Sequence, residues 1–166
     1  YKGLIFDLRF NYGGEVNAAI KVASMLVPEG PIVHIVDKNG SIDSKPATAE
    51  FINKPFVILI NEYTASSAEI VAGAVKDYAS GTLVGTKTHG KGVVQTVFPL
   101  DSNTSVKLTT DKYLTPHKHD IHEKGIEPDI EVSLKNNEKP TILPTTPVYD
   151  SQLSKAVEVL IEKTNQ

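Results

Sequence analysis

Three small hydroxyl residues, Thr64, Ser66 and Ser67, stand in the segment NEYTASSAEI, directly after the apolar run PFVILI. The run predicts a buried strand and the residues after Ser66 predict a helix, so the hydroxyls occupy a strand-to-helix turn. Serine and threonine commonly cap a helix at such a turn, and Glu69, three residues after Ser66, would complete a capping box. Hydrolases use the same kind of turn to expose a serine nucleophile. The segment alone favours capping and leaves the second interpretation open.

A serine nucleophile needs a general base, and the segment HGKG offers Lys91 between two glycines. Glycines on both sides let the backbone bend so that the amine points inward. A lysine drawn into an apolar site is less stable in its charged form and can accept a proton from serine, as in Ser-Lys enzymes. Gln95 follows in a predicted strand, where it would share a face with Lys91 and hold the amine without adding charge. A solvated lysine in a tight loop is the simpler interpretation of GKG alone, and His89 is the second candidate for the base.

The elements that must position these residues alternate along the chain. Strands are predicted at 3–9, 55–61 and 82–86, helices at 15–27 and 66–79, and antiparallel pairs at 32–37 with the segment after Asn39-Gly40 and at 93–100 with 105–115. A tract rich in Pro and Thr at 136–150 predicts an extended linker, and a last amphipathic helix follows from Ser151, its expected N-cap. This order predicts an α/β fold, with a core at 1–135, the linker at 136–150 and a C-terminal helix at 151–166 that packs on the core.

Composition narrows the function classes. The chain has 166 residues, enough for one domain, with 40% hydrophobic and 22% charged residues. A net charge of −3 gives no reason to expect nucleic acid or an anionic membrane as a partner. The absence of cysteine excludes disulfides, thiolate catalysis and Cys-based zinc sites. No apolar run approaches the roughly 20 residues that span a bilayer. Because the chain lacks an initiator Met and enters a strand at once, we expect it to be an excised piece of a longer protein.

Five segments together carry a family resemblance. They are DLRFNYGG, NEYTASSAEIVAGAVKDY, VGTKTHGKGVVQTVFPL, LTTDKYLTP and KGIEPDIEV, in the order found in C-terminal processing peptidases, also called tail-specific proteases. The resemblance covers the chain from about Gly3 to Val132, and the closing DSQLSKAVEVL is similar to the last helix of that family. Five segments in register are far more specific than any one of them. The chain therefore resembles the catalytic core of this peptidase family.

The resemblance implies roles for individual residues. Ser66 corresponds to the nucleophile, Lys91 to the general base and Gln95 to its supporting glutamine. The oxyanion hole would be formed by backbone N–H groups of Ser67 and of a glycine in the loop after the first strand. Gly13 is the favoured glycine, and Gly14 is the alternative.

The resemblance also implies the wider properties of the protein. The expected fold is the ClpP/crotonase-like ββα superhelical core, with an antiparallel hairpin region and a C-terminal helix. The expected activity is cleavage of protein or peptide substrates near their C-termini, without a metal or organic cofactor. A PDZ domain and an additional strand normally precede this core, and the PDZ domain would supply the selectivity for peptide tails. The family usually works outside the cytoplasm, in the periplasm, on the cell surface or in a lumen. Whether the protein forms a homo-oligomer is left open.

The sequence departs from the family pattern near the turn and in the first loop. Small residues change identity at Thr64, Ser67 and Ala68, where the family usually has Ser, Ala and Ser. Aromatic residues, Phe10 and Tyr12, replace the usual Asn and Pro before the glycine pair, and His89 replaces a commonly aromatic residue. None of these changes removes a catalytic group. Asp77 matches a position that is often acidic, and we expect it to be structural.

Three other interpretations compete with a peptidase. The chain could be a folded but inactive module that binds peptides or serves as a scaffold. The segment HKHDIH offers metal ligands at His117, His119, Asp120 and His122, although the corresponding family segment is a polar hairpin turn. An acyl-CoA enzyme of the crotonase type shares the expected architecture, but that similarity does not explain GKG or Gln95.

Overall fold

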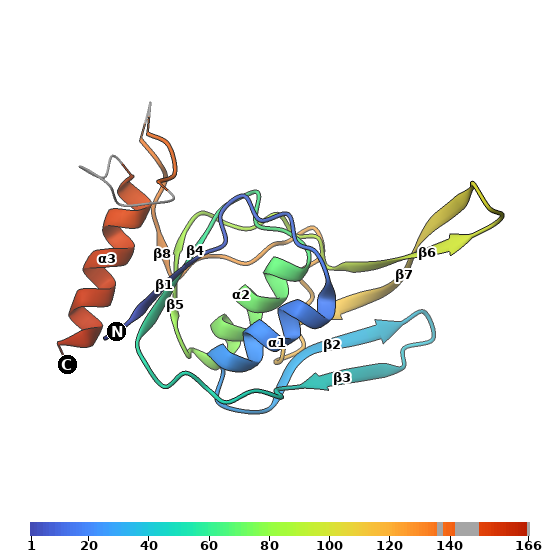
Figure 1. Cartoon of the computed structure of the whole chain (residues 1–166), viewed down its shortest axis with the longest axis horizontal. Coiled ribbons are helices and arrows are strands. Elements are labelled where there is room, and N and C mark those ends of the chain that lie inside the picture. Colours follow the sequence, from blue (N-terminus) through green and yellow to red (C-terminus); the bar gives the residue numbers. More distant parts are fainter. Residues whose placement is uncertain (136–137, 142–149, 166) are drawn as a thin grey trace.

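Two four-stranded sheets and three helices make up the computed structural model, which describes residues 1–135, 138–141 and 150–165 (Figure 1). The elements in chain order are β1 (Leu4–Asp7), α1 (Val16–Leu26), β2 (Pro31–Asp37), β3 (Ile42–Pro46), β4 (Phe56–Ile60), α2 (Ser67–Tyr78), β5 (Thr82–Gly85), β6 (Val93–Pro99), β7 (Ser105–Leu114), β8 (Ile130–Glu131) and α3 (Ser151–Thr164). One sheet is parallel, with the order β1-β4-β5-β8, and the other is antiparallel, with the order β3-β2-β7-β6. This architecture confirms the predicted α/β fold with an antiparallel hairpin region.

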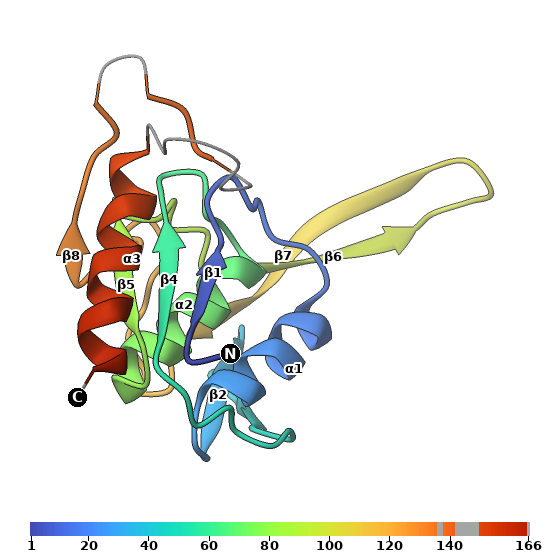
Figure 2. The same cartoon turned by 60° about the vertical axis from the view of Figure 1, so that its left-hand side comes forward.

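The parallel sheet is covered by helices on both faces (Figures 1 and 2). In β4, Phe56, Ile58 and Ile60 pack with α1 and α2, whereas Val57 and Leu59 pack with α3. None of these five side chains is more than 1% exposed. A strand that is buried on both faces needs apolar side chains at every position, which explains the continuous run PFVILI.

The carboxyl ends of β1, β4 and β5 meet at one edge of the parallel sheet, because the three strands run parallel and in register. Three loops leave from this edge, at residues 8–15, 61–66 and 86–92. In α/β folds, the crevice at this edge is where ligands bind. The loops carry Gly13, Gly14, Ser66 and Lys91 among the residues that the sequence singled out.

Helix α1 begins after Glu15, whose carboxylate accepts hydrogen bonds from the N–H groups of Asn17 at 2.9 Å and Ala18 at 2.7 Å. These two hydrogen bonds lower the pKa of Glu15 below its usual value, so the cap stays ionised at neutral pH. The helix ends just before Pro28, in line with the predicted stop at residues 28–31.

The antiparallel sheet carries a long hairpin, β6–β7, that projects away from the helices (Figure 1). Its register shifts between Val94 and Gln95, which marks a β-bulge. The second hairpin, β2–β3, turns at residues 38–41 through Gly40 at φ 84°, as the Asn-Gly pair predicted.

Helix α3 lies on the outer face of the parallel sheet, with Ala156 and Val159 packed against β4 and β5 (Figure 2). The prediction that Ser151 is its N-cap is wrong, because Asp150 caps the helix by accepting a hydrogen bond from the Leu153 N–H at 2.9 Å. Ser151 is the first helical residue, and its hydroxyl donates to Glu138. The predicted linker falls mainly on residues 136–137 and 142–149, which lie outside the described part of the chain.

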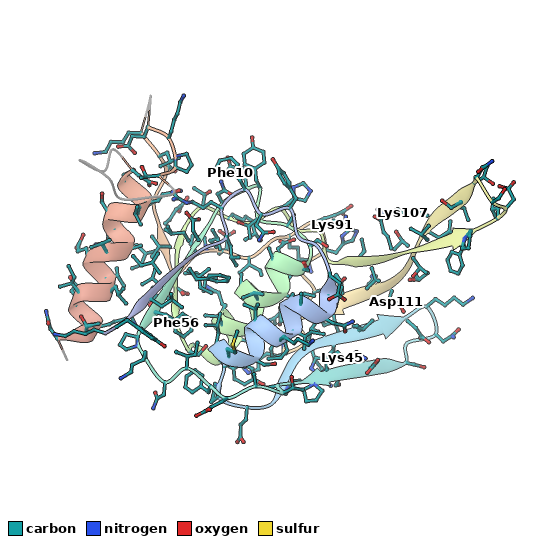
Figure 3. The ribbon with its side chains drawn as sticks, in the orientation of Figure 1. Phe10, Lys45, Phe56, Lys91, Lys107 and Asp111 are labelled. Carbon is teal, nitrogen blue, oxygen red and sulfur yellow. The ribbon has the colours of Figure 1, made fainter. Side chains whose placement is uncertain are left out.

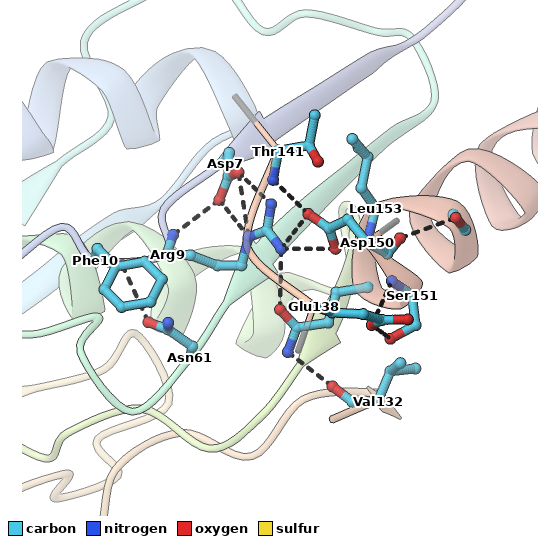
Figure 4. Close-up of polar contacts among 12 residues, drawn as sticks. Asp7, Arg9, Phe10, Asn61, Val132, Glu138, Thr141, Asp150, Ser151 and Leu153 are labelled. Carbon is cyan, nitrogen blue, oxygen red and sulfur yellow. Dashed lines mark hydrogen bonds and ion pairs between the residues drawn. The ribbon is translucent and has the colours of Figure 1, made fainter. Parts of the chain in front are cut away.

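A buried ion cluster ties α3 to the end of β1 (Figure 4). The Arg9 guanidinium donates to both carboxylate oxygens of Asp150, at 2.9 and 3.0 Å, and also to Asp7 and Gln152. The side chains of Arg9 and Asp150 are only 1% and 0% exposed. A guanidinium and a carboxylate are tolerated at such burial because hydrogen bonds satisfy both groups, with Nη1 of Arg9 donating to Asp150 and Nε and Nη2 donating to Asp7.

Candidate active site

Ser66 lies at the tip of the sharp turn between β4 and α2, half-buried, with φ 56° and ψ −123°. An ordinary N-cap residue has an extended backbone, so this conformation is unusual for a serine that only caps a helix. Strained residues of this kind gather at active sites, and the nucleophile turn of hydrolases is one example. The local geometry therefore favours the second interpretation of the segment.

The buried carboxylate of Glu69 connects the serine turn to the lysine loop. Its Oε2 accepts hydrogen bonds from the backbone N–H of Ser66 at 2.9 Å and of Lys91 at 2.8 Å. Its Oε1 accepts from the Thr88 hydroxyl at 2.6 Å and the Gly90 N–H at 2.7 Å. Glu69 is 0% exposed. One oxygen thus holds the backbones of both predicted catalytic residues. The backbone nitrogens of Ser66 and Lys91 can lie no farther apart than the summed lengths of these two hydrogen bonds.

Capping, the role that the sequence suggested for Glu69, accounts for only one of these four hydrogen bonds. The other three come from a loop about twenty residues farther along the chain. A glutamate in the first turn of a helix is common, so only its complete burial, which the sequence does not reveal, marks it as part of the site.

The glycines beside Lys91 are required by close packing. A Cβ at Gly90 would lie 2.8 Å from the Gly125 N, and a Cβ at Gly92 would lie 2.6 Å from the His122 N. Gly90 also has φ 87°, a conformation that favours glycine. The turn at residues 121–125 therefore packs closely against the lysine loop. The half-buried Lys91 lies between the two tight contacts that Gly90 and Gly92 make with this turn.

Gln95 does not lie in one regular strand with Lys91, contrary to the sequence prediction. Strand β6 begins only at Val93, and the bulge between Val94 and Gln95 interrupts the alternation of side chains. The two-residue period therefore does not relate Gln95 to Lys91. Gln95 is exposed, and no hydrogen bond joins it to Lys91 among the described residues.

Gly13 lies against the serine turn. A Cβ at this position would lie 2.7 Å from the Ala65 carbonyl oxygen, 2.8 Å from Ser66 Cβ and 3.0 Å from Ser67 N, and its φ is 93°. Only glycine permits this approach. The first loop and the turn are also joined by a hydrogen bond from the Ala65 N–H to the Asn11 carbonyl oxygen at 3.0 Å.

The candidate oxyanion donors differ in their present partners. The Gly13 N–H donates to Asn11 Oδ1 at 2.9 Å, and the Gly14 N–H donates to Ser67 Oγ at 2.8 Å. The Ser67 N–H is at the first position of α2 and donates no hydrogen bond to any described residue. The Ser67 nitrogen lies close to Gly13 and its N–H has no partner among the described residues, whereas each glycine N–H would have to exchange its present side-chain partner for a substrate oxygen.

A cavity of about 210 Å³ opens beside the glycine loop. Its lining is mostly apolar, and includes Phe6, Leu8, Val22 and Val71 together with Gly14 and Ser67. The cavity has room for one small apolar side chain next to the serine turn.

Of the remaining candidates, His89 adjoins this centre and Asp77 does not. His89 is exposed, and its backbone N–H donates to the Thr64 carbonyl oxygen at 3.0 Å. Asp77, near the end of α2, accepts hydrogen bonds from the His117 N–H at 2.7 Å and from His119 Nδ1 at 3.2 Å. It anchors the turn after β7, which agrees with a structural role. No group of three or more potential metal-ligating side chains is gathered in the part of the chain that the structure describes.

The arrangement brings together a strained serine, a lysine and an unengaged backbone donor at the carboxyl edge of a parallel sheet. Figure 3 shows Lys91 at the base of the β6–β7 hairpin and Phe10 on the loop that follows β1. No hydrogen bond joins Ser66 Oγ to Lys91 Nζ among those of the described residues. Catalytic hydrogen bonds of enzymes without substrate are often long and shorten when substrate binds. A nucleophile, a base and oxyanion donors are the requirements for acyl transfer.

Comparison with known proteins first defines the class. The solved structure of the photosystem II D1 C-terminal processing protease superposes with a TM-score of 0.75 and 38% identity, covering 96% of this chain and 39% of that one. The α/β fold of this chain is therefore that of the ClpP/crotonase-like serine peptidases.

The family follows from the sequence matches. The model of Peptidase family S41 matches residues 1–132, and the chain belongs to this family. A carboxyl-terminal-processing protease of Synechocystis is 45% identical over 128 residues, covering 76% of this chain and 30% of the relative. A chloroplastic C-terminal processing peptidase of Tetradesmus obliquus is 40% identical over 145 residues, covering 86% of this chain and 30% of the relative. The chain thus spans about a third of the length of these relatives.

Proposed function

We propose that this chain is the catalytic core of a serine endopeptidase that cleaves protein substrates near their C-termini with Ser66 and Lys91. The observation that carries the proposal is the hydrogen bonding of Glu69, whose Oε2 accepts from the N–H groups of both residues. A buried carboxylate with this pair of partners fixes the backbone of a strained serine close to the backbone of a lysine. Such fixed placement is what a nucleophile and its base require.

In the proposed reaction, the neutral Lys91 amine removes the proton from the Ser66 hydroxyl, and Ser66 Oγ attacks the scissile carbonyl. The backbone N–H groups of Ser67 and Gly13 bind the oxyanion, with the substrate oxygen replacing Asn11 Oδ1 as the acceptor at Gly13. The Lys91 ammonium then protonates the leaving amine, and water hydrolyses the acyl-enzyme by the same route. Gln95 would orient the lysine once substrate is bound.

Two further features belong to the proposal. A PDZ domain would deliver the C-terminal tail of the substrate to this core, since such domains capture a peptide carboxylate by strand addition. The protein would work outside the cytoplasm, as the resemblance to C-terminal processing peptidases implies. None of the described helices combines the length and the apolar character that a membrane span requires. Fractionation of the producing cells tests the location.

The test of the proposed function compares Ser66→Ala with Ser67→Ala in the full-length protein. Ser66→Ala should lower hydrolysis of a denatured protein by about 10,000-fold or more and abolish labelling by a fluorophosphonate, because the nucleophilic hydroxyl is lost. Ser67→Ala keeps its backbone N–H and should retain most activity. Equal activity of Ser66→Ala and the unmodified protein would contradict the assignment.

A second candidate is a folded but inactive module that binds peptides. It is favoured by the hydrogen bonds that the Gly13 and Gly14 N–H groups already make. The same fluorophosphonate experiment decides, because an inactive module would leave Ser66 unlabelled.

A further inference from the structure

Three aromatic side chains, Phe10, Tyr12 and Tyr63, gather on the surface and are called here the aromatic cluster. The Phe10 and Tyr63 rings are stacked with centroids 5.0 Å apart, and the Tyr12 ring meets Tyr63 edge-on at 6.2 Å. Phe10 and Tyr63 are each 43% exposed and Tyr12 is 67% exposed. A group of exposed aromatic rings contributes little to the core, and such patches mark binding surfaces.

The aromatic cluster is held by the backbone at its base. The buried Asn61 side chain accepts hydrogen bonds through Oδ1 from the N–H groups of both Phe10 and Tyr63, each at 3.1 Å. Phe10 has φ 59°, a left-handed conformation that bulky residues rarely adopt. The fold therefore bears backbone strain at a position where an aromatic ring is displayed to solvent, and strain of this kind gathers at functional sites.

The aromatic cluster also adjoins the predicted nucleophile. Tyr63 precedes Ser66 by three residues, and Tyr12 directly precedes Gly13, whose Cβ would lie 2.8 Å from Ser66 Cβ. An extended polypeptide advances about 3.3 Å per residue. Substrate residues within a few positions of a bond cleaved at Ser66 therefore reach the aromatic cluster.

We propose that the aromatic cluster recognises an apolar side chain of the polypeptide substrate close to the scissile bond, an inference that rests on the proposed function. The cluster has no charged member, and aromatic rings gain binding energy from apolar contact area and from stacking.

The test uses the full-length protein and a set of synthetic peptides with the same scissile bond. In each peptide one position near that bond carries Phe, Leu, Gly, Glu or Arg, and the other positions are unchanged. The unmodified protein should cleave peptides with Phe or Leu at one of these positions at least about 10-fold better than those with Gly or Glu. Phe10→Asn should abolish most of this preference through a higher KM with kcat retained, because it removes binding but no reacting group.

Phe10→Asn separates lost recognition from lost folding. Asparagine tolerates a positive φ, so the variant relieves backbone strain and should unfold at the same or a higher temperature. Tyr12→Ser, at the most exposed position, provides a second variant. Phe98→Asn is the matched control, because Phe98 is also 43% exposed but lies on the projecting hairpin, and it should keep the preference.

Fluorophosphonate labelling of Ser66 distinguishes a failure of the proposed peptidase function from a failure of substrate recognition by the aromatic cluster. Absence of both labelling and cleavage in the unmodified protein would overturn the proposed function, and this inference with it. Normal labelling with an unchanged peptide preference in Phe10→Asn and Tyr12→Ser would overturn this inference alone. A preference for Arg would also overturn it, since it would indicate that the substrate binds through its cation to Glu62, the exposed residue that directly precedes Tyr63. So would a change of oligomeric state in the variants with selectivity intact, since another protein surface would then cover the aromatic cluster.

Discussion

At the scale of single residues, the site depends on one buried carboxylate that serves four donors. Glu69 accepts from two backbone N–H groups that flank the reaction centre, from Gly90 and from the Thr88 hydroxyl. The Thr88 hydroxyl oxygen in turn accepts a hydrogen bond from the Ile126 N–H at 2.7 Å. Since a buried donor left without a partner costs about 1–3 kcal/mol, this network resists rearrangement and keeps the serine turn and lysine loop in a single geometry.

Replacing Glu69 with Gln tests this function of the carboxylate. The amide nitrogen of glutamine cannot accept hydrogen bonds. Wherever it replaces a carboxylate oxygen, its own N–H groups would therefore lie against the N–H groups that now donate to Glu69. We expect a loss of about 2 kcal/mol or more in the free energy of unfolding and a fall in kcat larger than the change in KM. Glu62→Gln is the control, because Glu62 is exposed and accepts a hydrogen bond from the Thr86 hydroxyl outside the network. Full activity of Glu69→Gln with normal stability would contradict the role of Glu69 in holding the serine turn and the lysine loop.

The sequence predicts the serine and the lysine of the candidate site, but it does not predict the carboxylate that joins their backbones. Ser66 and Lys91 stand out because their neighbours form distinctive segments. Glu69 does not, since its role requires residues 88–91 to fold back onto the start of α2. The predicted position of Gln95 depends on the regular alternation of a strand, and a bulge that the sequence does not mark interrupts that alternation.

At the scale of elements, the close approach of the first loop to the serine turn shapes the proposed oxyanion region. Gly13 makes that approach possible because a side chain there would strike the backbone of Ala65 and Ser67. The Asn11 carbonyl oxygen and the Asn61 side chain hold the same two segments together from either side. Two loops from neighbouring parallel strands thus act as one unit.

Gly13→Ala should therefore inactivate the enzyme. The new Cβ would lie 2.7 Å from a carbonyl oxygen, so the loop must retreat from the turn and carry its N–H away from the oxyanion. Loss of one oxyanion donor typically costs about 100-fold or more in kcat. Gly40→Ala is the matched control, because Gly40 also has a positive φ, 84°, but no atom lies within 4 Å of the position that its new methyl group would take. Wild-type kcat in Gly13→Ala would exclude this glycine from the oxyanion hole.

Element boundaries show where sequence prediction reaches its limit. The long apolar or amphipathic segments, such as β4 and α2, have strong periodicities and are predicted nearly to the residue. The two-residue β8 is too short to have one. At the start of α3, Asp150 and Ser151 are both good N-caps, and the choice is made by Arg9, which is distant in sequence.

At the scale of the whole molecule, α3 completes the second face of the parallel sheet and is held there by the Arg9–Asp150 pair (Figure 4). The pair joins Arg9, in the loop that follows β1, to Asp150, the residue that caps the last helix. The ion pair therefore connects α3 directly to the loop that carries Gly13.

Asp150→Asn tests this link. The substitution removes one charge from a fully buried pair and leaves Arg9 undercompensated, which should cost about 3 kcal/mol or more in the free energy of unfolding. Thermal or denaturant unfolding measures the effect. Glu158→Gln, which breaks an exposed ion pair with Lys155 on the same helix, should leave the midpoint unchanged. Equal stability of the two variants would mean that apolar packing alone holds α3.

The central claim is that Lys91 accepts the proton from Ser66, and turnover of Lys91→Arg tests it most directly. Hydrolysis of a denatured protein by the variant and the unmodified enzyme should be compared from about pH 6 to about pH 10, the range in which a lysine that serves as base is expected to lose its proton. A guanidinium stays protonated throughout this range and cannot act as a base. We predict that turnover by the unmodified enzyme rises with pH while the arginine variant remains lower by about 100-fold to 10,000-fold at every pH. Appreciable turnover by the arginine variant would contradict the account and make His89 the next candidate for the base.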